Sequence, residues 1–296
     1  MKQKTLFCGS ATALITPFTE DGIDFDALER LLEFQIENKT DALVICGTTG
    51  EPATMTYEER DKVVAFALRV VRGRVPVIVG TGANATQNAI ATSRRATDAG
   101  ADALLVVTPF YNKCTQEGLF QHYKAVCETT DLPVICYNVP GRTGVNILPE
   151  TLKRMAEIKT LSAIKEASGS LDQITEMASL VGDALDIYSG DDGLTLPILS
   201  VGGKGVISVA SNIAPRAVHD LCADFFAGKI NEARAMQCKL YPLVKALFCE
   251  VNPIPVKTAA SLMGFGQCHL RLPLCDMSEA HRRLLENEMR SFGLNF

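Results

Sequence analysis

The chain has 296 residues, of which 47% are apolar and 21% charged, and its net charge is −5. This length suits one large barrel or two small domains, and the apolar share supports a large core. No basic stripe is present, which excludes nucleic acid as an expected partner. The apolar runs are too short to cross a bilayer, and the N-terminal segment does not resemble an export signal. We therefore expect a cytoplasmic protein that acts on small molecules.

The ten cysteines and four histidines do not form the spacings of a metal site or a disulfide framework. No CxxC pair occurs, and Cys46 and Cys136 lie inside apolar runs, where a thiol behaves as a small hydrophobic group. Residues 80–85, GTGANA, match the dinucleotide fingerprint, but Asp102 precedes the next strand instead of ending it. We expect no disulfide, no metal and no cofactor.

Short apolar, β-branched runs alternate with helical stretches along most of the chain. Their starts lie mostly about 30 residues apart, which is the period of βα units in a parallel sheet. Near-continuous apolar character fits strands that are buried on both faces. The eight runs cover residues 12–18, 42–47, 75–80, 103–109, 133–139, 161–167, 185–190 and 205–211.

Helix signals stand between these runs. Asp24 and Thr56 are candidate N-caps, Glu59 completes a capping box with Thr56, and Pro149 suits a first helical turn. Eight such units predict an α/β fold, a (β/α)8 TIM barrel. We expect the barrel to span residues 1–227 and a C-terminal helical appendage, residues 228–296, to pack on it.

Catalytic groups of such a barrel lie where the strands end, which directs attention to Lys165. Strand alternation places Leu161, Ala163 and Lys165 on one face, and the small Ala163 indicates an interior face with room beside it. Burial lowers the pKa of an amine and yields the neutral nucleophile that attacks a carbonyl. The alternative is a lysine at the barrel rim that pairs with a carboxylate.

Tyr137 on the preceding strand favours the catalytic interpretation. Ile135 and Tyr137 share a face as Ala163 and Lys165 do, so the phenol should lie near the amine and could transfer protons. A buried tyrosine that only packs is the alternative.

Two loops carry candidate carboxylate-binding groups. The turn at residues 47–50, GTTG, combines close backbone approach with hydroxyl and amide donors. Arg142 lies on a loop bracketed by glycines, and its guanidinium can donate two parallel hydrogen bonds to a carboxylate. Each could instead be an ordinary polar turn or a solvent-facing arginine.

These residues belong to segments that together resemble the dihydrodipicolinate synthase family, the 4-hydroxy-tetrahydrodipicolinate synthases of lysine biosynthesis. The resemblance runs end to end and keeps the order of the family's motifs. The segments are GTTGE (47–51), YNVPGRTG (137–144), IKEASG (164–169), YSGDD (188–192) and NPIPVK (252–257).

The resemblance implies a lyase of the diaminopimelate pathway in which Lys165 forms a Schiff base with pyruvate. It makes Tyr137 the proton donor and acceptor, with Thr48 and Tyr111 completing a proton relay. In this family the relay tyrosine crosses from a neighbouring subunit, so Tyr111 implies a dimer contact, within a homotetramer built as a dimer of dimers.

The resemblance also implies how the two substrates are held. Thr49 and the backbone around it would bind the pyruvate carboxylate, Ile207 would border the pocket through its main chain, and Gly190 would form its wall. Arg142 would bind the carboxylate of L-aspartate 4-semialdehyde, the second substrate.

The chain departs from lysine-sensitive bacterial members of the family at three positions. Those members usually carry His, Glu and Tyr where this chain has Arg60, Asn88 and Phe110. The loss of an acidic ligand for an α-amino group implies weak feedback inhibition by lysine.

Two other functions remain open from the sequence. One is a related pyruvate lyase or aldolase, such as an N-acetylneuraminate lyase or a sugar-acid aldolase, which would share Lys165, Tyr137 and the GTTG turn without requiring Arg142. The other is a barrel that has lost catalysis and acts as a binding protein, which would be expected to have lost part of this set of residues.

Overall fold

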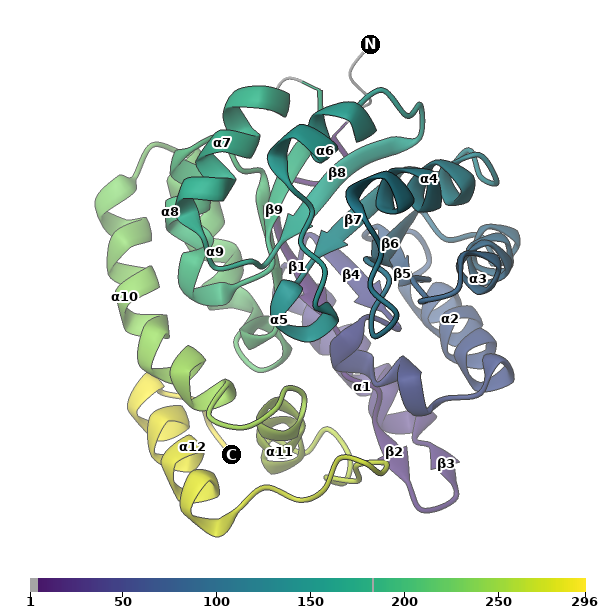
Figure 1. The fold of residues 1–296 in the computed structure, drawn as a ribbon. Coiled ribbons are helices and arrows are strands. Elements are labelled where there is room, and N and C mark those ends of the chain that lie inside the picture. The colour runs from purple at the N-terminus through teal and green to yellow at the C-terminus, as the bar shows by residue number, and fades with distance from the viewer. Residues whose placement is uncertain (1–4, 183) are drawn as a thin grey trace.

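A computed structural model describes residues 5–182 and 184–296, in which eight parallel strands close into a barrel (Figure 1). Neighbouring strands follow the order β1-β10-β9-β8-β7-β6-β5-β4, and the predicted (β/α)8 barrel is therefore confirmed. Strands β2 (Phe18–Thr19) and β3 (Gly22–Ile23) form a separate hairpin. The barrel strands are β1 (Gly9–Ala13), β4 (Ala42–Ile45), β5 (Val77–Gly80), β6 (Ala103–Val107), β7 (Val134–Asn138), β8 (Leu161–Glu166), β9 (Asp186–Ser189) and β10 (Gly205–Ser208).

Helices surround the barrel, and the predicted helix starts are confirmed. Asp24 accepts the amide hydrogen of Ala27, Thr56 and Glu59 form both bonds of a capping box, and Pro149 opens its helix. The helices through the end of the barrel are α1 (Phe25–Glu37), α2 (Tyr57–Val71), α3 (Thr86–Ala99), α4 (Gln116–Cys127), α5 (Pro140–Thr143), α6 (Pro149–Met155), α7 (Leu171–Val181), α8 (Thr195–Ser200) and α9 (Pro215–Phe226).

Two apolar clusters follow from the alternation of side chains along the strands. The larger cluster lies between the strands and the helices. The smaller cluster fills the barrel interior and includes Ala163, Ile135 and Tyr137. Because one cluster covers each face of the sheet, the strand sequences are nearly continuous apolar runs.

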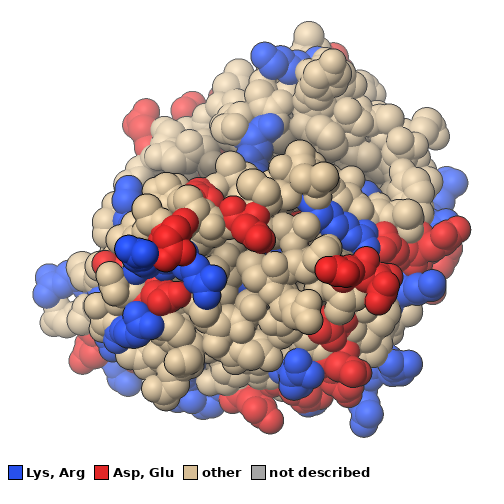
Figure 2. Space-filling view, turned by 90° about the horizontal axis from the view of Figure 1, so that it is seen from below, with Lys and Arg blue, Asp and Glu red and all other residues tan. Residues whose placement is uncertain are grey.

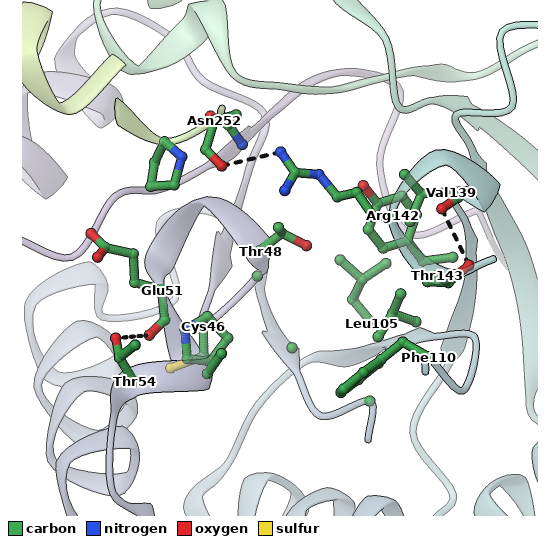
Figure 3. Close-up of a pocket in the computed structure, with 18 of the residues that line it drawn as sticks. Cys46, Thr48, Glu51, Thr54, Leu105, Phe110, Val139, Arg142, Thr143 and Asn252 are labelled. Atoms are coloured by element: carbon green, nitrogen blue, oxygen red, sulfur yellow. Dashed lines mark hydrogen bonds between the residues drawn. The ribbon is translucent and has the colours of Figure 1, made fainter. Parts of the chain in front are cut away.

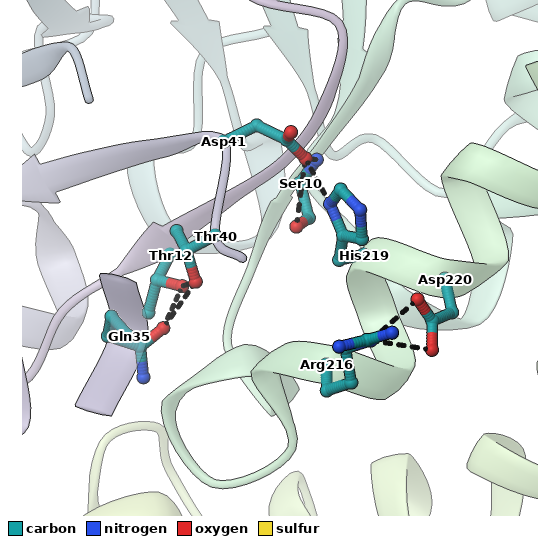
Figure 4. Close-up of polar contacts among 8 residues, drawn as sticks. All are labelled: Ser10, Thr12, Gln35, Thr40, Asp41, Arg216, His219 and Asp220. Atoms are coloured by element: carbon teal, nitrogen blue, oxygen red, sulfur yellow. Dashed lines mark hydrogen bonds and ion pairs between the residues drawn. The ribbon is translucent and has the colours of Figure 1, made fainter. Parts of the chain in front are cut away.

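The first strand lies earlier in the sequence than predicted. The apolar run at residues 12–18 indicated the strand, but β1 ends at residue 13 and begins in a more polar segment. The polar groups are buried because partners satisfy them: the Ser10 amide donates to the Asp41 carboxylate at 2.7 Å, and the Thr12 hydroxyl donates to Gln35 at 2.6 Å (Figure 4). Hydropathy alone therefore misplaced this strand.

The interior face of β8 also differs from the prediction at one residue. Leu161 belongs to the outer cluster, whereas Ala163 belongs to the interior one. The register against β7 shifts between Val134 and Ile135, so one extra residue of β8 interrupts the strict alternation. Lys165, two residues after Ala163, keeps the predicted interior orientation.

Three further helices follow the barrel and lie along one side of it (Figure 1, green to yellow). They are α10 (Ile230–Leu247), α11 (Ile254–Leu262) and α12 (Glu279–Phe292). Helix α10 packs against α9 and α12, and it also contacts α8. The prediction of helices only after residue 214 holds for the described residues, while the domain division at residue 227 stays a prediction. None of the helices described is long and apolar enough to span a membrane.

A buried ion pair ties this C-terminal region to the barrel. The Lys257 ammonium on α11 donates to the Glu51 carboxylate at 2.5 Å and to the main-chain oxygen of His269 at 2.8 Å. The Lys257 and Glu51 side chains are only 1% and 2% exposed. Burial lowers the pKa of Lys257, although the charge of Glu51 opposes that shift. The pair therefore depends on both partners being present.

We expect Lys257→Met to lower the free energy of unfolding by about 3–5 kcal/mol, because it leaves the Glu51 carboxylate buried without its cation. Replacing both residues by Met should recover most of that loss. As a control, Arg216→Met removes the exposed pair with Asp220 (Figure 4), which should cost at most about 1 kcal/mol. Urea titration measures all three variants, and a Lys257→Met loss no larger than that of Arg216→Met would contradict the expectation.

Candidate active site

The pairing of β7 with β8 brings the two central candidates together. Tyr137 is the direct register partner of Lys165, as their matching strand positions predicted. The Lys165 amine lies 4.3 Å from the centre of the Tyr137 ring. Both side chains are buried, at 5% and 6% exposure. A primary amine and a phenol therefore share a largely dry position inside the barrel.

Burial determines the ionisation of Lys165. Desolvation lowers the pKa of the amine to about 8, the negative charge of Asp192 acts in the opposite direction, and the positive charge of Arg142 lowers it further. The alternative of a rim lysine paired with a carboxylate does not describe this amine, which is buried and on which Asp192 acts through its charge without a hydrogen bond. The amine can therefore be neutral near neutral pH and act as a nucleophile.

Gly190 leaves the space that the Lys165 side chain occupies. A Cβ atom at this position would lie 3.0 Å from Cε of Lys165 and 2.8 Å from Cβ of Ala167. The Gly190 amide also donates to the main-chain oxygen of Glu166 at 2.7 Å. A larger residue would clash with Ala167 and press on the stem of Lys165, so the packing here favours glycine.

The Tyr137 phenol faces Thr48 and is held in its neutral form. Burial raises its pKa to about 12, while the charge of Arg142 and a hydrogen bond with the Thr48 side chain act against that rise. A phenol that remains protonated but is bonded to a second hydroxyl can pass a proton on. The structure therefore brings Lys165, Tyr137, Thr48 and Gly190 together as expected.

Asp192 is a buried carboxylate near this group to which the sequence assigned no role. Its Oδ2 accepts the amide hydrogens of Val209 and Ala210 at 2.9 and 3.0 Å. Burial raises the pKa of this carboxyl, and hydrogen bonds including one from Ser208 oppose the rise. Asp192 thus supplies the nearby negative charge that favours the protonated form of Lys165.

A cavity of about 410 Å³ opens beside these residues, and Thr48, Tyr137 and Arg142 line it (Figure 3). Lys165 is not itself among the lining residues, but its amine lies against the ring of Tyr137, which is. Arg142 is held by α5, whose first turn closes through bonds from the amides of Arg142 and Thr143 to the Val139 oxygen. This volume and its charge suit a small anionic substrate.

One wall of the cavity comes from the C-terminal region, which the sequence did not connect with the site. Asn252 lines the cavity together with Val251 and Pro253. Its side-chain amide donates to the Thr49 hydroxyl at 3.0 Å, and its main-chain oxygen accepts a hydrogen bond from Arg142 at 3.1 Å. The NPIPVK segment was the only signal for this residue, and it indicated no contact.

The other predicted site residues lie in different surroundings. Ile207 is part of the interior cluster that also contains Tyr137, and Thr49 is buried in the turn between β4 and α2. Tyr111, in contrast, is 90% exposed and has a left-handed backbone, with φ of 73°. Within the described chain it does not line the cavity.

The three positions that the resemblance links to lysine binding lie in two different places. Arg60 and Phe110 line the outer part of the same cavity, whereas Asn88 is exposed on α3. The Arg60 guanidinium donates to the main-chain oxygen of Pro52 and lies 5.3 Å from the centre of the Tyr57 ring.

The glycines of the dinucleotide-like segment are explained by packing. A Cβ at Gly80 would lie 2.1 Å from the main-chain oxygen of Cys46, and one at Gly82 would lie 2.4 Å from the Val107 amide nitrogen. Close approach of neighbouring strands therefore requires these glycines without any nucleotide.

The face in Figure 2 carries acidic and basic side chains side by side, with no continuous basic stripe on it. This mixture agrees with the overall charge of −5. Nothing on that face has the charge distribution expected of a nucleic-acid-binding surface.

Known proteins resemble the chain over nearly its full length. A 4-hydroxy-tetrahydrodipicolinate synthase of Clostridium acetobutylicum is 51% identical over 290 residues, which are 98% of this chain and 99% of that protein. The dihydrodipicolinate synthase of Thermotoga maritima is 48% identical and superposes with a TM-score of 0.97, covering 98% of this chain and all of that one.

A dihydrodipicolinate synthase variant characterised as monomeric is equally similar, with 48% identity, a TM-score of 0.97 and 98% coverage of both chains. The model of the dihydrodipicolinate synthetase family matches residues 6–291. The chain therefore belongs to the dihydrodipicolinate synthetase family.

Proposed function

We propose that this protein is a cytoplasmic 4-hydroxy-tetrahydrodipicolinate synthase. It condenses pyruvate with L-aspartate 4-semialdehyde in the diaminopimelate route to lysine. The observation that carries the proposal is the buried Lys165 amine, with its pKa lowered to about 8, in register with Tyr137. The names of the relatives support the choice of this lyase over a sialic acid or sugar-acid aldolase. An intact set of reactive groups argues against a barrel that has lost catalysis.

The first half of the reaction joins pyruvate to Lys165. The neutral amine attacks the ketone carbon, Tyr137 protonates the oxygen that becomes the carbinolamine hydroxyl, and water leaves as the iminium forms. The Thr49 hydroxyl and adjacent backbone bind the pyruvate carboxylate. Loss of a methyl proton then converts the iminium into an enamine, with Tyr137 and Thr48 accepting and passing on the proton.

The second half builds the ring. The enamine carbon attacks the aldehyde carbon of aspartate semialdehyde, whose carboxylate is bound by Arg142. The aldehyde oxygen takes up a proton from Tyr137 and becomes a hydroxyl, and the iminium on Lys165 forms again. The substrate amine then attacks the iminium carbon, and the bond from that carbon to Lys165 breaks to release the free enzyme. Arg142 suits this role because it lines the cavity and is fixed by the Asn252 carbonyl.

Tyr111 supports a homo-oligomer in which one subunit completes the site of another, and we propose a dimer of dimers. An aromatic side chain that is 90% exposed on a left-handed residue is costly for an isolated chain and suits insertion into a partner. There its hydroxyl would extend the relay from Thr48 and Tyr137.

Weak inhibition by lysine stays a prediction of the proposal. Asn88 carries no charge to attract the α-amino group of lysine, and the fixed positive charge of Arg60 at the cavity would repel a cationic ligand.

Borohydride reduction in the presence of pyruvate should add one pyruvate-derived mass to the peptide that contains Lys165. Lys165→Met should abolish the gain, whereas Lys124→Met should keep it, because Lys124 is exposed on α4, where it pairs with Glu128, and does not line the cavity. Mass spectrometry of the intact protein and of its peptides measures this. A wild-type protein that gains no mass would rule out the Schiff base.

Imine formation should depend on pH through the Lys165 amine. Below the pKa of about 8 the neutral fraction falls tenfold for each pH unit, so the single-turnover trapping rate should fall likewise and level off above it. Asp192→Asn removes a charge that raises this pKa, so it should move the levelling point to lower pH. A rate independent of pH between 6 and 9 would contradict a titrating lysine nucleophile.

Tyr111→Phe should lower kcat by about 10- to 100-fold while leaving the oligomer intact, because it removes only the hydroxyl that relays protons. Sedimentation velocity should show an oligomer for both proteins, and steady-state kinetics should separate them. Phe110→Leu, which alters the neighbouring ring, is the control for packing. Tyr111→Phe with wild-type kcat would exclude Tyr111 from the relay.

A further inference from the structure

Asn252 joins the two groups to which the proposed function assigns the substrate carboxylates. It lies between α10 and α11, more than 200 residues from Thr49 along the chain, and is 6% exposed. Its side chain contacts Thr49 and its main chain contacts Arg142. Figure 3 shows Asn252 facing Arg142 across the cavity, above Thr48 and Glu51.

The direction of the Thr49 hydrogen bond is what gives Asn252 a chemical role. The Asn252 amide nitrogen can only donate, so the Thr49 oxygen accepts this bond and its own hydroxyl hydrogen points elsewhere. Among the described residues the structure gives the Thr49 hydroxyl no hydrogen bond in which it is the donor. Thr49 is 2% exposed, so a ligand carboxylate in the site is the natural acceptor.

The segment that carries Asn252 is anchored next to the turn that carries Thr49. The Lys257 amide donates to the Pro253 oxygen at 2.9 Å, and the Lys257 ammonium pairs with Glu51, two residues after Thr49. Glu51 itself has a left-handed backbone, with φ of 55°, which aims its side chain towards α11. The Lys257–Glu51 pair and the Asn252–Thr49 hydrogen bond thus join the C-terminal segment to the turn at two points.

We propose that Asn252 is a positioning residue for the two-substrate reaction. Its side chain orients the Thr49 hydroxyl as a donor to the pyruvate carboxylate, and its main-chain carbonyl holds the Arg142 guanidinium for the second carboxylate. This inference rests on the proposed function. It predicts that changes to the side chain act on pyruvate more than on aspartate semialdehyde, because the carbonyl survives substitution.

Steady-state kinetics of Asn252→Ala and Asn252→Asp test the proposal. Asn252→Ala should raise KM for pyruvate about tenfold and KM for aspartate semialdehyde by less than about threefold, with a smaller change in kcat. Asn252→Asp should raise KM for pyruvate further. Its carboxylate accepts the Thr49 hydrogen, which reverses the bond, and places a negative charge near an anionic substrate.

Gln35→Ala is the matched control. Gln35 is a buried amide that also bonds to threonine hydroxyls, Thr12 and Thr40, but in the layer between β1 and α1 (Figure 4). Gln35→Ala should therefore lower the melting temperature and leave KM for pyruvate unchanged. Asn252→Asp in a Thr49→Val background should lose most of its excess effect over Asn252→Ala, since the hydroxyl to be reversed is absent.

The inference is overturned if Asn252→Ala keeps the wild-type KM for pyruvate, or if Asn252→Asp binds pyruvate as well as or better than Asn252→Ala. Asn252→Ala alone decides the question if the aspartate variant does not fold. Borohydride trapping on Lys165 of the wild-type protein distinguishes a failure of this inference from a failure of the proposed function. If the wild-type protein is trapped but the Asn252 variants keep the wild-type KM for pyruvate, only this inference is wrong. If the wild-type protein is not trapped, the proposed function is wrong.

Discussion

The burial of one amine inside a closed barrel is the constraint on which the site depends. A lysine in the interior is costly while it is charged, so desolvation favours the neutral amine and brings the pKa of Lys165 to about 8. Nearby groups adjust that balance in opposite directions, Asp192 by its negative charge and Arg142 by its positive charge. The same burial raises the pKa of Tyr137, which keeps a proton on the phenol. The proposed nucleophile and the proposed proton donor thus owe their protonation states to one environment.

The barrel provides this environment by closing and by register. Closure removes sheet edges and surrounds the interior side chains on all sides, while the β7–β8 register places Tyr137 beside Lys165. Gly190, directly after the next strand, leaves room for the lysine stem. The bulge in β8 matters too, because it lies before Ala163 and leaves the alternation from Ala163 to Lys165 intact.

The C-terminal helices are part of the site as well as of the fold. The buried Glu51–Lys257 pair fixes α11 against the turn after β4, and Asn252 extends from that anchor to Thr49 and Arg142. A buried ion pair contributes little net stability compared with apolar packing, but it fixes which groups lie opposite each other. That property suits a region that we propose acts by positioning the substrate-binding groups.

The sequence by itself determined the fold class, the strand periods, the helix caps and the placement of Lys165 and Tyr137. Each of these follows from side-chain alternation along a strand or from a residue and its near neighbours in the chain. The first strand was misplaced because a local pattern does not show distant partners. Ser10 and Thr12 are polar, and only the fold shows that Asp41 and Gln35 satisfy them inside the protein. Tertiary structure alone decided the contacts of Asn252, the anchor between Glu51 and Lys257, and the charge of Asp192 near the amine. These groups meet only after the barrel has closed, and electrostatic and hydrogen-bond energies depend on distance in space, which no short-range sequence pattern encodes.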